Sequence, residues 1–514
     1  MPSRTRRARK NSGAAFRSHH PHHAGQPGEA ASSRSASAGA PAEAVPRREK
    51  TLVIVVVAVA AALRLTIAVL NDAANDNHLQ VVHMLLDGSS SLDMSHCHEC
   101  FHPKLFYWGF ALLVRLLGLA TSFWQLRIGQ VLNATFGITT VLIVYRFLLL
   151  QRFSSGVRVL VVALAALNPA FLAINGQFTN DSLVILLSAA GIFAIARYAD
   201  EQRLRHFGLA AVCLTLAFAT KGTSWVSGLS ALLSLLIGAV AIRRQGGPRP
   251  RRNVFLAAVL TALLLSAIGS AGYDFRSYRI YANLGKDAKV HMFEKTYVAR
   301  PGVVSIYDSY LTFRLFDLIQ HPYTGNTTTL VPLHRSSVFS QLYGRLHFLH
   351  LDFWPRAWQL RDTTFFFVGR FNLVLGLVPT GLFLVGVLLG LRKQVVALAR
   401  DGLVQWVRTQ REPDLICLLL CLGYLAFIVK FTYDFRDFSG MKPVYLFPGI
   451  LGFVKVLADG YQWTADRLGR IKYLRTVLAA LSTLLLAGYT ADAVVLIGQL
   501  VERFGAAVRA AGLH

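Results

Sequence analysis

The sequence has 514 residues, of which 54% are hydrophobic and 16% are charged, with a mean hydropathy of +0.45. This composition excludes an ordinary soluble protein of this length and indicates a multi-spanning membrane protein. The formal net charge of +26 would suit nucleic-acid binding, but Lys and Arg occur in short segments between apolar runs. That arrangement is typical of basic cytosolic loops, so nucleic acid is not expected as a partner.

The N-terminal segment, residues 1–50, is rich in Ser, Ala, Gly, Pro and Arg and has no apolar periodicity. It is predicted to be a disordered, basic cytosolic tail. The first apolar run, residues 51–70, follows a long polar leader and precedes no small-residue cleavage site, which favours a retained anchor over a removed signal peptide. Four histidines between positions 19 and 23 could bind a metal, although a solvated stretch is the commoner case in such a tail.

Positive charge decides which apolar runs cross the bilayer. The basic loop at 146–158 should lie on the same side as the tail, so an even number of crossings separates the two. Of the two apolar runs in between, 105–120 is short, contains Arg115 and is therefore predicted to be interfacial or re-entrant, while 128–145 spans. Continuing this count along the chain predicts an all-α polytopic membrane protein with about 11 transmembrane helices.

The same count divides the chain into regions on either side of the membrane. Basic cytosolic loops are predicted at 197–206, 243–252, 392–411 and 466–475. The outer side is predicted to hold 71–127, 174–181, 220–224, 272–364, 430–443 and the C-terminus. We therefore expect an N-terminal transmembrane catalytic module at 51–271 that includes the first outer loop, an extracytoplasmic loop region at 272–364, and C-terminal transmembrane helices at 365–514. Function is expected on the outer face, at the membrane surface.

The first outer loop begins with a dense set of ionisable residues. Asp72, Asp76, His78 and His83 follow the first span directly, where one carboxylate could serve as a general base. The alternative is a solvated loop in which an Asp caps a short amphipathic helix. Both interpretations place these residues near the lipid interface.

Cysteine and histidine are concentrated a few residues further on. His96, Cys97, His98 and Cys100 have the ligand types and density of a zinc site. A single CxxC is an incomplete tetrahedral set, and an outer loop is oxidising in many compartments, so a Cys97–Cys100 disulfide or free thiols are the alternative. The other cysteines, at 213, 417 and 421, lie in apolar runs and are expected to be small core residues.

The order of these features resembles the GT-C membrane glycosyltransferases. The similarity rests on one span, an acidic loop with Asp76, a His-Pro segment that continues HPKLFYW, a basic turn, and then LNPAFLAINGQFTNDSLVILL. It extends from about residue 51 to 460 and is greatest to the branch of the protein O-mannosyltransferases and the aminoarabinose transferase of lipid A, the family 39-like branch. The resemblance implies a GT-C-type helix bundle and a polyprenyl-phosphate sugar as donor.

The resemblance also implies roles for residues of the first outer loop. Asp76 best matches the catalytic carboxylate that follows the first span, with Asp72 as the competing alignment. Asn77 stands where relatives have a second acid, which weakens a metal role there. His78 and His102 are expected to bind substrate, and Lys104 replaces the second Pro of the His-Pro-Pro pattern.

Further along the chain, Asn180 and Asp181 match an Asn-Asp pair that opens an outer helix end. Both are expected to bind substrate; Asp181 could hold the acceptor or a metal, or simply cap that helix. No metal is assigned with certainty, but a divalent metal is a possible cofactor.

An anionic lipid phosphate as leaving group calls for Lys and Arg on the outer face. The candidates are Lys221, Arg335, Arg436 and Lys442, with Tyr445 as a further substrate contact. Lys221 lies in a very short outer turn, TKGTSW, and could alternatively be a snorkelling Lys at a helix end. Arg436 and Lys442 could instead pair with nearby Asp residues in a structural turn. The aromatic residues between 272 and 364 suit sugar stacking, although an interfacial belt is the commoner role.

The predicted function is transfer of a sugar, mannose-like or another hexose or pentose, with inversion and with Asp76 as general base. The acceptor would be a glycan, lipid or protein outside the cytoplasm of a bacterial inner or plasma membrane, and membrane lipid would surround the enzyme. The alternative is a polytopic transporter or lipid flippase. No repeated half is visible in the hydropathy, and ionisable groups gather outside rather than mid-span, which argues against transport. A catalytically inactive scaffold of the same fold is a third possibility.

Overall fold

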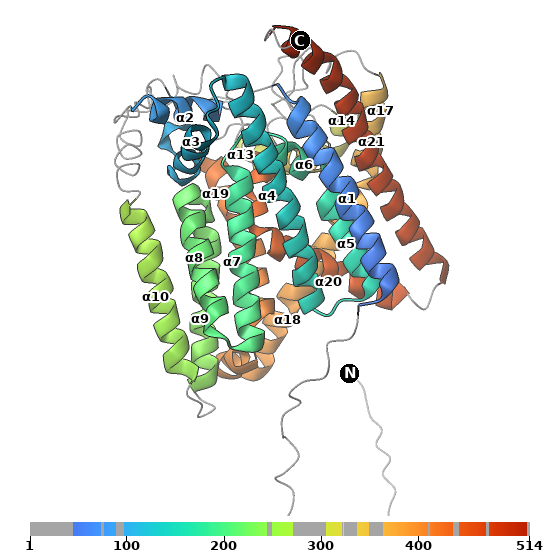
Figure 1. The fold of residues 1–514 in the computed structure, drawn as a ribbon. Helices are drawn as coiled ribbons and strands as arrows, with labels where there is room; N and C mark the ends of the chain where they lie inside the picture. Colours follow the sequence, from blue (N-terminus) through green and yellow to red (C-terminus); the bar gives the residue numbers. More distant parts are fainter. Residues whose placement is uncertain are drawn as a thin grey trace, which may run out of the picture. The chain divides into compact units, whose positions relative to one another are not determined.

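The structure is a computed structural model, and it describes residues 45–72, 77–88, 97–243, 249–270, 305–320, 322, 337–348, 363–409, 412–434, 441–468 and 472–510. Every regular element within these ranges is a helix, which confirms the all-α prediction (Figure 1). The predicted tail up to residue 44, Asp76, His96, Arg335 and Arg436 lie outside the described residues.

Among the described residues, eight helical segments are long and apolar enough to cross a membrane. They are α1 (Arg47–Leu70), α4 (Ser122–Leu150), α7 (Asp181–Glu201), α9 (Trp225–Arg243), α10 (Arg249–Ser270), α17 (Thr363–Leu375) together with α18 (Leu377–Thr409), α19 (Glu412–Asp434) and α21 (Lys472–Ala510). A ninth arises if α5 (Ser155–Leu167) and α6 (Pro169–Asn175), bent by 51°, form one span. The multi-pass fold is thus confirmed, whereas the count of eleven stays a prediction.

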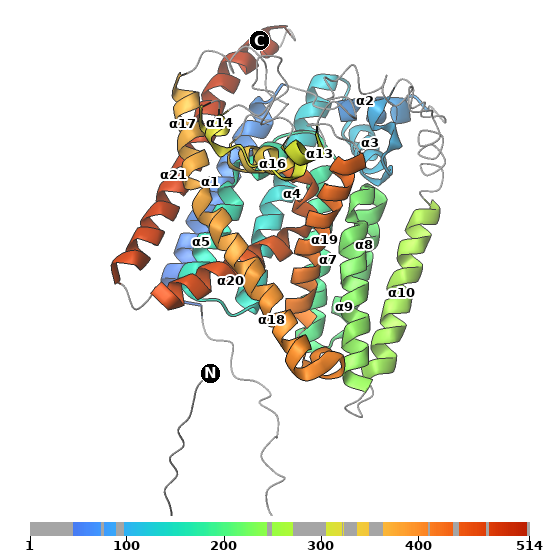
Figure 2. The same cartoon turned by 180° about the vertical axis from the view of Figure 1, so that it is seen from behind.

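Two more helices run alongside these segments in the bundle (Figures 1 and 2). α8 (Leu204–Thr220) is apolar but has only 17 residues. α20 (Ile450–Leu468) has 19 residues and contains Lys455 and Asp459, which form an ion pair at 2.7 Å. Its charged side chains set α20 apart from the uniformly apolar segments. These two helices fall where the charge count placed its remaining crossings.

Helices α4, α7, α9, α18 and α20 end towards the lower side of Figure 1, where α1 begins. The side of the membrane on which these ends lie stays a prediction. The short helices gather at the opposite end, together with the last turn of α1. They include α2 (His78–Leu86), α3 (Leu105–Leu117), α13 (Ile306–Tyr310), α14 (Leu315–Gln320) and α16 (Val338–His347). We call this the α2–α3 end of the bundle.

α3 corresponds to the run 105–120 that the charge count removed from the spans. Its 13 residues extend about 20 Å, which is too short for a bilayer core. α2 packs beside α3 and is joined to α4 by a hydrogen bond between His83 Nε2 and Gln125 Oε1 (2.8 Å). α2 and α3 thus form a small layer on the α2–α3 end.

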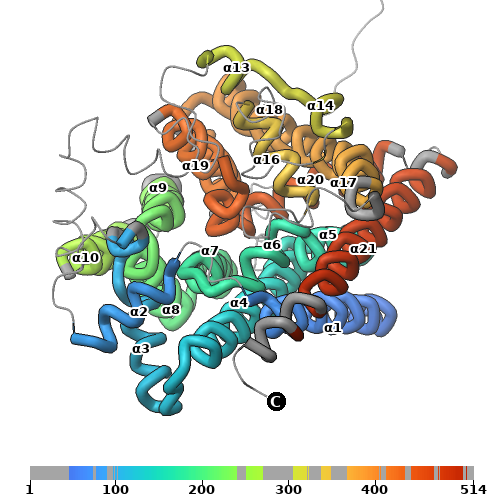
Figure 3. The backbone as a smooth tube through the Cα atoms, turned by 90° about the horizontal axis from the view of Figure 1, so that it is seen from above, coloured from blue at the N-terminus to red at the C-terminus, as the bar shows by residue number. Residues whose placement is uncertain are grey.

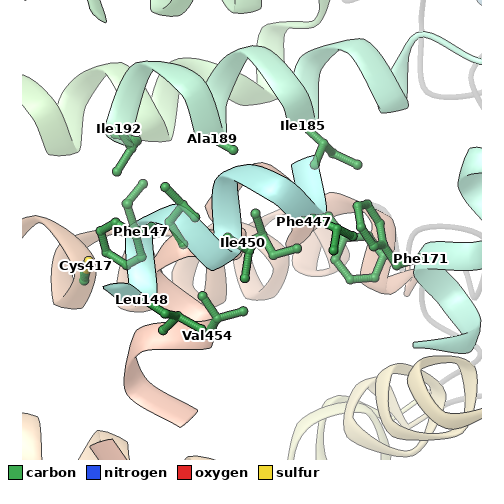
Figure 4. Close-up of a cluster of buried hydrophobic side chains, with 14 of the residues drawn as sticks. Phe147, Leu148, Phe171, Ile185, Ala189, Ile192, Cys417, Phe447, Ile450 and Val454 are labelled. Atoms are coloured by element: carbon green, nitrogen blue, oxygen red, sulfur yellow. The ribbon is translucent and has the colours of Figure 1, made fainter. Parts of the chain in front are cut away.

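The centre of the bundle is formed by α6 and α7. Seen from above, they lie between α4 on one side and α19 and α20 on the other (Figure 3). The buried side chains between these helices are mostly apolar (Figure 4), and the labelled ones are Phe147, Leu148, Phe171, Ile185, Ala189, Ile192, Cys417, Phe447, Ile450 and Val454. Close van der Waals packing is the main attraction between helices that lipid surrounds.

The break between α5 and α6 has an identifiable cause. Pro169 occupies the first position of α6 and the Asn168 side chain accepts the N–H of Phe171 (3.1 Å), so a new helix starts there. The buried Arg64 of α1 donates to Ala166 O (2.6 Å) and Asn175 Oδ1 (2.9 Å), and its guanidinium lies 5.0 Å from the Phe171 ring centroid. Arg64 thereby satisfies backbone and amide oxygens at the break and fixes the direction in which α6 leads to α7.

The approach of α18 to α20 depends on two glycines. A Cβ at Gly386 would lie 1.9 Å from Val456 O, and a Cβ at Gly460 would lie 1.9 Å from Leu382 O. Both obstacles are backbone atoms, so helices must separate to accept any side chain. We expect Gly386→Ala to destabilise the protein by about 1–3 kcal/mol, measured as a lower melting temperature in detergent. A Cβ at Gly381 in the same helix would have no atom within 4 Å, so Gly381→Ala should melt at the same temperature as the parent. An equal fall in melting temperature in both variants would contradict the close approach of α18 and α20.

Candidate functional site

A buried ion pair joins the start of α7 to the turn after α8. Lys221 Nζ donates to Asp181 Oδ1 at 2.7 Å, and the two residues are 5% and 7% exposed. Thr179 Oγ1 donates to Asp181 Oδ2 and accepts the backbone N–H of Asp181, each at 2.9 Å. Lys221 is therefore not a snorkelling side chain. Breaking such a pair on one side typically costs about 3–5 kcal/mol, because a buried charge loses its partner.

Asn180, the residue before Asp181, is fully buried and makes no side-chain cap to α7. Its Nδ2 donates instead to Thr220 O at 3.4 Å, at the end of α8. Asn180 and Asp181 both tie the start of α7 to the α8–α9 turn.

A second group of polar side chains lies in α2 and in the short helix η2 (His98–Phe101) that precedes α3. The buried Glu99 carboxylate lies 3.0 Å from His102 Nε2 and 3.7 Å from His78 Nδ1. His78 Nδ1 also hydrogen-bonds to Tyr107 OH at 2.7 Å, and the His78 and His102 rings are stacked with centroids 6.3 Å apart. The two histidines expected to bind substrate thus share one carboxylate.

Charge interactions join the two groups. Lys221 interacts electrostatically with Glu99 and His102, and His78 with Asp181. The Lys221 ammonium also lies 5.6 Å from the ring centroid of Tyr445 in η5 (Pro443–Tyr445). We call His78, Glu99, His102, Asp181, Lys221 and Tyr445 the central polar cluster. Five of its six members were predicted site residues, and they come from three distant parts of the sequence.

Burial determines the charge of His102 in the cluster. Burial lowers the pKa of His102 to about 4, with Lys221 and His78 adding to the effect and Glu99 opposing it. His102 is therefore uncharged at neutral pH. The Lys221 ammonium forms an ion pair with Asp181 and also interacts electrostatically with Glu99.

The depressed pKa of His102 makes stability pH-dependent. In the unfolded chain this His takes up its proton near pH 6.5, but in the folded protein only near pH 4, so stability falls as the pH drops through that window. The loss should reach at most about 3 kcal/mol. We expect the melting temperature of His102→Gln to fall less than that of the parent between pH 7 and pH 4. His347 is also buried with a pKa lowered to about 3, but it is present in both proteins, so its contribution cancels in the comparison. Parallel profiles of melting temperature against pH for the two proteins would contradict the prediction.

Only some of the remaining predicted residues lie in the part of the chain that the structure describes. Lys442 directly precedes the helix of Tyr445 and is partly buried. Asp76, Arg335, Arg436 and His96 lie outside the described residues, as does the side chain of His98. Their roles stay predictions.

The structure joins Cys97 and Cys100 in a disulfide, so neither sulfur is a thiolate that could bind zinc. Within the described residues there is no group of three or more His, Cys, Asp or Glu side chains arranged to hold a metal ion. Asp181, the other proposed metal contact, already has the Lys221 ammonium as its counter-ion. The described part of the site thus does not fit a resident metal. Cys213, Cys417 and Cys421 are free and buried, as expected.

Two features of the site were not predicted as such. Glu99 is not among the predicted site residues, although its i, i+3 spacing to His102 is a usable signal. Asn133 of α4 donates to Gln177 O and Thr179 O, each at 2.7 Å, and so holds the loop before α7. Its signal was a polar residue in line with Arg127 and Gln130 at helical spacing inside an apolar run.

One comparison with known proteins covers part of the helix bundle. Residues 101–268 match the family model of the dolichyl-phosphate-mannose-protein mannosyltransferases. The matched range contains three members of the central polar cluster, His102, Asp181 and Lys221. No curated protein matches the sequence significantly. The match agrees with the resemblance to the protein O-mannosyltransferase branch of the GT-C glycosyltransferases that the sequence suggested.

Many solved structures are similar to this chain, among them the following three. The apo oligosaccharyltransferase of Archaeoglobus fulgidus is 14% identical, with a TM-score of 0.47, over 87% of this chain and 56% of that one. ArnT from Cupriavidus metallidurans bound to undecaprenyl phosphate is 13% identical, with a TM-score of 0.32, over 80% and 77%. The S. cerevisiae protein O-mannosyltransferase Pmt1–Pmt2 complex bound to the sugar donor is 17% identical, with a TM-score of 0.33, over 48% and 35%. This chain therefore spans little more than half the length of the oligosaccharyltransferase.

Proposed function

We propose that this protein transfers a sugar from a polyprenyl-phosphate donor to an acceptor on the extracytoplasmic side of a membrane. The observation that carries the proposal is the central polar cluster, within which Lys221 and Asp181 form a buried ion pair at the α2–α3 end. The family match over residues 101–268 supports sugar transfer as the chemistry. A lipid-linked donor keeps its phosphate at the membrane surface, which is where short interfacial helices gather.

The reaction we propose is a single displacement at the anomeric carbon. The bond from this carbon to the phosphate oxygen breaks, the acceptor hydroxyl oxygen forms a new bond from the opposite face, and the hydroxyl proton passes to Asp76. The sugar is mannose-like or another hexose or pentose, and its configuration inverts. Asp76 precedes His78, a member of the cluster, by two residues in the sequence. This neighbourhood in the sequence supports the assignment of Asp76.

Lys221 is proposed to stabilise the negative charge of the departing phosphate. An ammonium group has three N–H donors, and among the described residues Asp181 is the acceptor that hydrogen-bonds to one of them. The others can reach a phosphate oxygen without loss of the ion pair. Lys442 beside Tyr445, together with Arg335 and Arg436, would complete the set of cations, while His78, His102, Asn180 and Tyr445 contact the sugar or the acceptor.

The acceptor class is tested in cells. We expect deletion of the gene to remove one sugar from a glycan, an envelope lipid or a secreted protein, detected by mass spectrometry of all three fractions. Complementation with the parent should restore the sugar and complementation with Lys221→Met should not. Unchanged mass spectra would remove the support for an envelope modification. Accumulation of an intact lipid-linked sugar on one leaflet with no product would favour a flippase instead.

A further inference from the structure

The lower part of α18 carries a basic groove that lies outside the central polar cluster. The groove has a volume of about 430 Å³, and Arg392, Lys393, Val396, Arg400 and Asp401 are among the residues that line it. Their spacing of three and four residues places most of them on one face of the helix. The proposed transfer reaction gives this face no role, and it lies towards the end of α18 that is opposite to α2 and α3 (Figure 1).

One of the three cations in the groove already has a partner. Lys393 donates to Asp414 of α19 at 2.9 Å. Asp414 also lies 3.1 Å from Lys455 of α20, which pairs with Asp459 at 2.7 Å. These two lysines and two aspartates balance one another, so Lys393 belongs to the ion pairs that join α18 to its neighbours.

Arg392 and Arg400 give the groove its positive charge. Both side chains are exposed. Arg400 lies 3.9 Å from Asp401 and is 84% exposed, and an ion pair that exposed contributes little. Two guanidinium groups therefore stand against the single carboxylate of Asp401, which leaves the face suited to an anion.

Exposed apolar side chains continue beside the groove. Leu384, Leu388, Val395 and Leu398 share one face of α18 and are between 44% and 65% exposed. The first two precede Arg392 and the last two follow it, so the apolar face extends past the first cation of the groove. On a helix that crosses a bilayer, acyl chains cover such a face. Acyl chains and guanidinium groups therefore meet over the same turns of α18.

α18 turns back below the groove. Gly402 has a φ of 69° and interrupts the helix, and Trp406 Nε1 donates to Gln394 Oε1 at 2.8 Å. In a straight helix these two residues would be about 18 Å apart along the axis, so the chain after Gly402 folds back towards Gln394. The predicted cytosolic loop 392–411 is thus helical up to residue 409, and a helix holds the two arginines of the groove.

We propose that the groove on α18 binds the headgroup phosphate of an anionic phospholipid of the surrounding bilayer, with Arg392 and Arg400 as its contacts and Val395 and Leu398 against its acyl chains. A guanidinium group can donate two parallel hydrogen bonds to phosphate oxygens, and basic surfaces beside membrane spans attract anionic headgroups. The apolar face favours a lipid over a soluble anion, because only a lipid gains from contact with it. This site is separate from the proposed sugar transfer and does not depend on it.

The first experiment measures the selectivity for the lipid headgroup. Full-length protein in detergent is titrated with dioleoyl phosphatidylglycerol or dioleoyl phosphatidylcholine, and native mass spectrometry gives the apparent Kd of the first bound lipid. The parent should bind phosphatidylglycerol about 10–30-fold more tightly, as expected for two cations near one headgroup. Arg392→Gln/Arg400→Gln should bind both lipids with the weaker affinity.

The control for this experiment removes the same amount of charge elsewhere. Arg47→Gln/Arg48→Gln changes two exposed arginines at the start of α1, at the same end of the bundle, and should keep the selectivity of the parent. Equal losses in the two double variants would show a general effect of net charge. Unchanged selectivity in Arg392→Gln/Arg400→Gln would show that the groove binds no headgroup. Either result overturns the proposal.

The second experiment distinguishes a lipid from a free anion. Glycerophosphoglycerol is the same headgroup without acyl chains, and it should not displace phosphatidylglycerol from the parent at equal concentration. Val395→Ser/Leu398→Ser keeps both arginines and should bind phosphatidylglycerol about 3–10-fold more weakly, because apolar contact is lost. Displacement by the soluble headgroup, or unchanged lipid affinity in the serine variant, would show an anion site without a lipid and would overturn the proposal.

Discussion

Replacement of Lys221 by Met is expected to reduce the rate of sugar transfer by about 100–1,000-fold, the usual effect of removing one donor that stabilises transition-state charge. Met is apolar and of similar length, so the packing volume is kept while the ammonium is lost. The measurement is kcat from single-turnover assays with a labelled polyprenyl-phosphate sugar. Lys393→Met serves as the control, because Lys393 is exposed and pairs with Asp414 away from the cluster.

Loss of folding has to be separated from loss of charge stabilisation in this variant. Lys221→Met leaves Asp181 buried without its counter-ion, which should cost about 3–5 kcal/mol of stability. The double variant Lys221→Met/Asp181→Asn removes both charges and should regain most of that stability. It should nevertheless remain inactive. A double variant that recovers activity together with stability would show that the ion pair is only structural.

Replacement of Asp76 by Asn is expected to have the second large effect, about 100–10,000-fold in kcat, because a general base is removed. KM for the donor should change little, since the base acts on the acceptor hydroxyl. Asp72→Asn is the matched control, four residues earlier in the same loop. If Asp72→Asn abolishes transfer and Asp76→Asn does not, the base is Asp72 and the alternative alignment applies.

The fold could be predicted from two properties of the sequence. Apolar runs identified most helices, and the spacing of Arg and Lys predicted that residues 105–120 do not span. This run forms α3, with 13 residues. The number of spans was harder to predict. α8 is one turn shorter than a typical span and α20 carries Lys455 and Asp459, so length and hydropathy do not separate these helices from interfacial ones.

The site was predictable residue by residue but not as a set of contacts. Lys221 stood out because a lone cation in a short turn between apolar runs is costly, and Asp181 because it opens a helix at the same end. Nothing in either segment specifies that the two should pair at 2.7 Å, because the pairing follows from how α7 packs on α8. The spacing of Glu99 to His102 is visible in the sequence, but its approach to His78 (3.7 Å) is not, because it depends on how α2 packs.

The central claim is that sugar leaves a polyprenyl phosphate at this site. Its most direct test is to incubate the purified full-length protein in nanodiscs with a synthetic polyprenyl-phosphate mannose of known anomeric configuration and a mixture of envelope acceptors. We expect polyprenyl phosphate and glycosylated product in equal amounts, with the anomeric configuration inverted, and neither with Asp76→Asn. Translocation of the intact lipid across a bilayer without release of polyprenyl phosphate, or equal transfer by parent and Asp76→Asn, would contradict the account.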